Sequence, residues 1–97
     1  MAMTVVVPRD VPGRTRGFLT SVMPEPAPGV YTAADLSKAV RERIWAVLSD
    51  WHNATGTTGS VIMLWRDAGE PGGLGVLTLG TTPRRLADLD GVLVSVW

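Results

Sequence analysis

The side chains best suited to binding chemistry crowd into one short turn that follows an apolar run. The stretch "VVVPRDVPGRTRGFL", residues 5 to 19, contains Arg9, Arg14 and Arg16, a third of the nine lysines and arginines. Three arginines less one aspartate, Asp10, give the first twenty residues a net charge of +2, whereas the whole chain sums to zero. Arginine donors fit phosphate, and a helix N-terminus adds unpaired N–H groups and a positive dipole end. The turn therefore indicates a phosphate-binding site.

Arg14 and Arg16 are two positions apart near the start of a predicted helix. At this spacing they flank the apolar stripe of the helix on opposite sides rather than stacking on one another. The alternative interpretation is that they are ordinary solvated side chains, paired with Asp10 or Glu25. The sequence alone leaves both interpretations open.

Asp10 is the only carboxylate between Met1 and Met23, and it stands where the first strand ends. In such a position an aspartate can hold Mg²⁺ or Mn²⁺ through its oxygen atoms and act as a catalytic residue in hydrolysis. One carboxylate is a poor metal site unless a symmetry mate supplies a second copy. The commoner use of aspartate at this position is to cap the following helix.

The remaining polar residues give weaker signals. His52 is the only histidine and cysteine is absent, so the sequence offers no zinc site and no catalytic triad. A charge at the C-terminus of the second helix explains His52 better. Arg84 and Arg85 form a second basic pair, in a predicted polar connection over residues 81–91.

Composition restricts the class of protein. Ninety-seven residues make one domain, over residues 1–97, and 45% hydrophobic with 19% charged residues is typical of a globular chain. The absence of cysteine suits a reducing cytosol. The first residues have no basic segment before their apolar run, and no apolar stretch approaches the roughly 20 residues of a membrane helix. We therefore expect a cytoplasmic protein with no membrane partner.

The apolar patterns predict a mixed α+β domain. One helix runs from about residue 11 to the prolines after residue 22, and a second from about residue 32 to residue 53. The predicted strands cover residues 3–7, 28–33, 60–65, 74–80 and 92–97. Two helices among five strands favour a ferredoxin-like fold, an antiparallel sheet with both helices on one face and an extra C-terminal strand.

Two segments predict contacts with partners. On the second helix, Trp45 falls opposite the predicted apolar stripe, which consists of Leu36, Val40, Ile44, Val47, Leu48 and Trp51. An outward tryptophan indicates either a partner surface or a cover from the loop 81–91. In "VLVSVW", apolar residues occupy nearly every position, so we expect this strand to be completed from outside through Val92, Val94, Val96 and Trp97.

Taken together, several segments resemble a known family. The pieces "MTVVV", "DVP", "RGFL", "GVYTAADLSKAVRERIW", "SVIMLW" and "DLDG" occur in this order between Met3 and Val96. The chain is similar to Cas2, the second core CRISPR-associated adaptation protein, in its subtype I-E form. The resemblance implies a ferredoxin-like protomer, a symmetric homodimer, and a place beside the Cas1 integrase in the capture of duplex DNA as new spacers.

The resemblance also implies roles for single residues. Arg14 and Arg16 fall on family positions that hold the DNA backbone, and Arg84 falls on a further phosphate-contacting position. The family's second basic pair sits one place earlier, so Pro83 replaces one member and Arg85 is displaced. The C-terminal tail falls where I-E relatives contact the integrase. Asp10 falls where family members carry either an amide or an aspartate that, as a pair across the dimer, is the metal ligand of members described as endonucleases.

Two functions from different classes follow. In the first, the protein binds protospacer duplex DNA and bridges the integrase, which performs the chemistry, so no cofactor is required. In the second, it is an endonuclease for RNA or DNA that uses Mg²⁺ or Mn²⁺ between paired Asp10 carboxylates. One acid per protomer favours the first. An unrelated ferredoxin-like binding module is a third, plainer interpretation.

Overall fold

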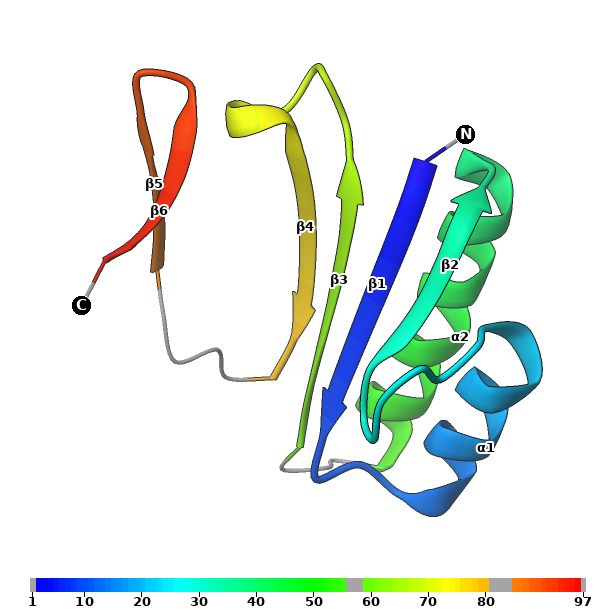
Figure 1. Cartoon of the computed structure of the whole chain (residues 1–97). Coiled ribbons are helices and arrows are strands. Elements are labelled where there is room, and N and C mark those ends of the chain that lie inside the picture. Colours follow the sequence, from blue (N-terminus) through cyan, green and yellow to red (C-terminus); the bar gives the residue numbers. More distant parts are fainter. Residues whose placement is uncertain (1, 56–58, 81–84, 97) are drawn as a thin grey trace.

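The computed structural model describes residues 2–55, 59–80 and 85–96, and Figure 1 shows their arrangement. The elements in chain order are β1 (Ala2–Arg9), α1 (Gly13–Val22), β2 (Tyr31–Leu36), α2 (Lys38–Thr55), β3 (Ser60–Arg66), a 3-10 turn η1 (Pro71–Gly73), β4 (Leu74–Leu79), β5 (Arg85–Leu89) and β6 (Val92–Val96). The fold is the predicted α+β class and is consistent with a ferredoxin-like domain. Neither helix in these described ranges is long and apolar enough to cross a membrane.

Four strands form one antiparallel sheet in the order β2-β1-β3-β4. Because β2 and β3 both run antiparallel to β1, they are parallel to each other, and α2 connects them across β1. This is the split β-α-β unit that the sequence predicted. Figure 1 shows α1 and α2 on the same side of the sheet.

The core lies between the helices and one face of the sheet. Side chains of β1 alternate along the strand, with Thr4, Val6 and Pro8 buried and their neighbours partly or fully exposed. The helices cover one face of β1 only, so the strand is not buried on both faces. The buried hydrophobic residues are Val6, Leu19, Met23, Tyr31, Ile44, Leu48, Val61 and Met63.

Pro8 lies inside β1 rather than ending it. The register with β3 continues through Pro8 opposite Val61 to Arg9, whereas the register with β2 reaches only Val6. On the β2 side the ladder thus stops before Pro8, which is where a residue without an N–H group is tolerated.

The second helix begins later than the sequence predicted. Residues 31–36 form β2, and Thr32 lies opposite Val5 in the sheet, so the prediction of a helix start near residue 32 is wrong. Instead the Ser37 hydroxyl accepts a hydrogen bond from the Val40 N–H at 3.2 Å. A serine at the N-cap satisfies a helix donor, and the strand takes the residues before it because they complete the sheet edge.

The buried face of α2 is also rotated from the predicted stripe. Arg41, Ile44 and Leu48 are buried, Trp45 is partly buried and packs against the core, and Val40 is 40% exposed. The expectation of an outward Trp45 was wrong. The guanidinium carbon of Arg41 lies 4.3 Å from the centre of the Trp65 ring, so the aromatic face accommodates a cation inside the apolar stripe.

The structure adds a strand where the sequence predicted a polar connection. Residues 85–89 form β5, which pairs with β6 in a separate two-stranded sheet. Asp90 and Gly91 join the two strands, with φ values of 52° and 85°. An Asp-Gly pair with both φ positive is the favoured hairpin loop, and this signal in "DLDG" was missed. Figure 1 shows the hairpin standing beside β4 and η1.

Candidate nucleic-acid interface

The basic turn, residues 9–16, joins the end of β1 to the first turn of α1. Pro12 precedes the helix and its carbonyl accepts the Thr15 N–H at 3.0 Å. The first turn of α1 contains no acidic residue and no side chain caps it. The positive end of the helix dipole is therefore not neutralised from within the first turn.

Arg14 and Arg16 are both exposed, and they point to different sides of α1. Arg14 lies over the Trp51 ring of α2, with its guanidinium carbon 4.5 Å from the ring centre. Arg16 lines a hollow of about 470 Å³ on the side of β1 and the bend before β2. The two arginines thus flank the buried Thr15 and Leu19, as the spacing predicted.

The alternative that acids neutralise these arginines is not what the structure shows. Within residues 2–55, 59–80 and 85–96 the ion pair present is Lys38 with Glu42, at 3.8 Å on the outer face of α2. Glu25 instead accepts a hydrogen bond from the Gly29 N–H at 2.9 Å. Arg14 and Arg16 therefore keep their donors available for an anion.

Asp10 follows β1 in a left-handed conformation, with φ of 54°. Gly59, which directly precedes β3, allows this close approach of the turn, because a Cβ there would collide with the main-chain oxygens of Arg9 and Asp10. Asp10 does not cap α1, so the capping interpretation was wrong. A non-glycine residue at positive φ is uncommon and stores some strain, which the packed turn must hold.

The carboxylate of Asp10 is exposed at the rim of the hollow that Arg9 and Arg16 also line. No group of three potential metal ligands occurs among the described residues. One carboxylate does not by itself fit Mg²⁺ or Mn²⁺, which take several oxygen ligands. A metal site at Asp10 thus needs a second carboxylate from outside the chain.

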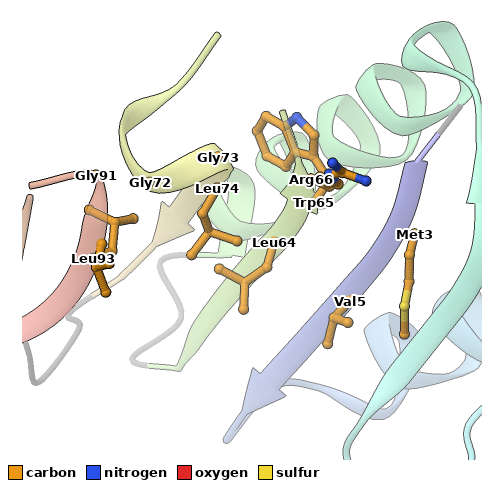
Figure 2. Close-up of a pocket in the computed structure, with 11 residues that line it drawn as sticks. Met3, Val5, Leu64, Trp65, Arg66, Gly72, Gly73, Leu74, Gly91 and Leu93 are labelled. Carbon is orange, nitrogen blue, oxygen red and sulfur yellow. The ribbon is translucent and has the colours of Figure 1, made fainter. Parts of the chain in front are cut away.

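The face of the sheet turned away from the helices is largely apolar. We call it the open face and define it by Met3, Val5, Leu64, Leu74 and Val76. Between this face, η1 and the β5–β6 loop lies a trough of about 610 Å³. Figure 2 shows Val5, Leu64 and Leu74 on the same side of the sheet, with Leu93 of β6 across the trough.

The chain matches one protein-family model over residues 3–94, that of the CRISPR-associated protein family Cas_Cas2CT1978. The match covers nearly the whole chain. This chain belongs to that family. It is a Cas2-type CRISPR-associated protein, as the resemblance predicted, and the family is consistent with a role in adaptation.

The residues predicted to contact partners lie in different parts of this Cas2-type chain. Trp45, on α2, packs against the core, whereas Val92, Val94 and Val96 share one face of the β5–β6 hairpin with Ala87 and Leu89. Leu93 faces the other way, toward η1, where a Cβ on Gly72 would come within 2.6 Å of its Cγ. The valine face is thus the hairpin face opposite to the one that packs on η1.

Three predicted site residues cannot be placed. Arg84 and Trp97 lie outside the described residues, and of Arg85 only the backbone, as the first residue of β5, is within them. The sequence did not predict Trp51 as a neighbour of Arg14. The apolar stripe predicted for α2 does include Trp51. Which residues of α1 it meets depends on how the two helices cross, and neither helix alone predicts that crossing.

Proposed function

We propose that this Cas2-type protein is a DNA-binding subunit of CRISPR adaptation that does no chemistry itself. It dimerises, holds the protospacer duplex through its phosphate backbone and bridges the Cas1 integrase, as in the I-E branch. The observation that carries the proposal is the pair of exposed arginines, Arg14 and Arg16, at an acid-free helix start. Arginine contacts to phosphate position a duplex without reading its sequence, which spacer capture requires.

The test is the double substitution Arg14→Ala with Arg16→Ala in the full-length chain with its integrase. We expect weaker binding of duplex DNA, equally for unrelated sequences, and a salt slope that falls by about one for each lost phosphate contact. The matched control is Lys38→Ala with Arg43→Ala, which removes the same charge from the exposed side of α2. Unchanged duplex binding by the basic-turn variant, or an equal loss in the control, would reject the proposal.

A homodimer is the second part of the proposal, and the open face supports it. The face exposes apolar side chains over three strands, and doubling the chain about a two-fold axis also doubles the basic turn on a protein of zero net charge. Light scattering should give twice the chain mass at micromolar concentration. Leu64→Glu, a charge at the centre of the open face, should give the monomer. A stable monomer in the unmodified protein would contradict this part.

A metal-dependent endonuclease is the alternative function, and the exposed carboxylate of Asp10 favours it. This carboxylate caps no helix and belongs to no ion pair among the described residues. Two such groups across a dimer axis would supply the ligands that one chain lacks. Asp10→Asn should abolish any cleavage of RNA or DNA in Mg²⁺ or Mn²⁺ and leave spacer acquisition intact. Loss of acquisition with the dimer still folded would favour the nuclease.

A further inference from the structure

The side chain of Arg14 is held on an aromatic surface, although it is exposed. Its guanidinium carbon lies 4.5 Å from the centre of the Trp51 ring. Trp51 is fixed in turn by Phe18 of α1, with ring centres 5.3 Å apart at an interplanar angle of 70°. The three side chains connect the first turn of α1 to the last turns of α2.

The stacking leaves the hydrogen-bonding capacity of Arg14 intact. A guanidinium group meets an aromatic ring with its flat face, whereas its five N–H donors lie in the plane and point outward. An exposed arginine ordinarily samples many rotamers and loses this freedom when it binds a phosphate. Stacking on Trp51 restricts that freedom before the phosphate arrives.

Arg16 provides the contrast within the same turn. It lies two positions further on, and among the described residues its guanidinium is stacked on no ring. It lines a hollow together with Asp10 instead. The two arginines therefore carry the same charge but differ in how their side chains are oriented.

We propose that Trp51 is a positioning residue for Arg14, which it holds in the orientation that binds a backbone phosphate of duplex DNA. The proposal rests on the proposed function, since it takes Arg14 to be a phosphate contact. Lysine cannot replace arginine in this arrangement. Its ammonium group has no flat face to stack on the ring, so contact with Trp51 would restrict the lysine side chain only weakly.

The test is a double-mutant cycle between Arg14→Lys and Trp51→Leu in the full-length protein with its integrase, read as affinity for a labelled DNA duplex of arbitrary sequence. Loss of an exposed cation–π contact should weaken binding by about threefold per copy, and about tenfold where a dimer contributes two copies. The salt slope should stay the same in both variants, because the charge at residue 14 is retained. The double variant should bind no more weakly than either single variant.

Additive losses in the cycle would overturn the proposal, since Trp51 would then act independently of Arg14. So would wild-type affinity in Trp51→Leu. Trp51→Phe, which keeps a ring, should restore most of the binding. Arg14→Ala separates the two proposals: if it leaves duplex binding unchanged, the proposed role of Arg14 itself fails.

A second measurement needs no substitution at Trp51 and covers the case in which Trp51→Leu does not fold. The Nε–Hε resonance of Arg14 should show a ring-current shift in the free protein and keep it when duplex DNA is added. A shift that is absent in the free protein, or that disappears on saturation with DNA, would show that the bound arginine is not the stacked one, and the proposal would be wrong.

Discussion

The strands β3 and β6 are equally apolar in sequence, yet they lie in different surroundings. In β3, Val61 and Met63 are buried beneath α2, while Ile62 and Leu64 are only partly covered on the open face. In β6 no residue is buried, and Val92 is 62% exposed. A run of apolar residues therefore identifies a strand without telling how many of its faces the chain itself covers. The uncovered faces are where partners are expected to bind.

The largest effect should follow from a substitution in the core between the four-stranded sheet and the two helices. Met63→Ala removes a fully buried side chain between the sheet and the helices and should lower the free energy of unfolding by about 2–5 kcal/mol. Val92→Ala, the matched control in the hairpin, should change it by less than about 0.5 kcal/mol. Urea denaturation measures both. An equal loss in the two variants would mean that the hairpin has a core of its own.

The hairpin should instead matter for partner binding. Val94→Asp places a charge in the centre of the valine face and should weaken integrase binding by about 2 kcal/mol, or roughly thirtyfold, while the fold stays intact. Ser95→Asp, on the opposite hairpin face, is the control and should bind the integrase normally. Deletion of residues 92–97 should abolish the interaction. Full-strength capture of the integrase by the folded deletion variant would remove the hairpin from the interface.

Two glycines, one directly before β3 and one inside α1, allow a prediction of an effect of intermediate size. Gly59→Ala would drive a methyl group into the backbone of Arg9 and Asp10, and should cost about 1–3 kcal/mol of stability. Gly17→Ala is the opposite case: it lies inside α1 with nothing within 4 Å of the added Cβ, and should stabilise the protein by about 0.5–1 kcal/mol. Thermal unfolding of the two variants should shift in opposite directions.

The sequence predicted the parts of this molecule that depend on local pattern. Helix α1 ends before Pro24, β3 and β4 occupy the predicted apolar runs, and Arg14 and Arg16 flank the buried stripe, because periodicity and turn chemistry determine these features. The sequence predictions were wrong where tertiary contacts determine the local structure. Residues 31–36 join the sheet because β1 has a free edge there, and Arg41 is buried because Trp65 from another element receives it.

The candidate site likewise combines features that the local sequence predicts with features that only tertiary packing creates. That Arg14 and Asp10 lie in one turn could be read from the sequence, but the Trp51 ring beneath Arg14 and the Gly59 contact beneath Asp10 come from segments more than thirty residues away. Only the packing of α2 and β3 against the turn brings them there. The valines of β6 were correctly predicted to lie in a strand, and of these Val92 is exposed whereas Val94 and Val96 are partly buried.

The smallest effect concerns the loop of the β5–β6 hairpin, and it tests whether the hairpin opens independently of the four-stranded sheet. Asp90 has φ of 52° in the loop between β5 and β6, and a β-branched residue tolerates this conformation poorly. Asp90→Val should therefore destabilise the hairpin locally by about 1 kcal/mol, while Asp90→Asn, which accepts positive φ, should leave it unchanged. In hydrogen exchange, the amides of β5 and β6 should exchange several-fold faster in Asp90→Val, and those of β1 and β3 at the wild-type rate. Because β6 contacts the body mainly through η1, opening of the hairpin does not require the sheet to open. Faster exchange throughout β1 and β3 would show that the hairpin and the four-stranded sheet unfold as one unit.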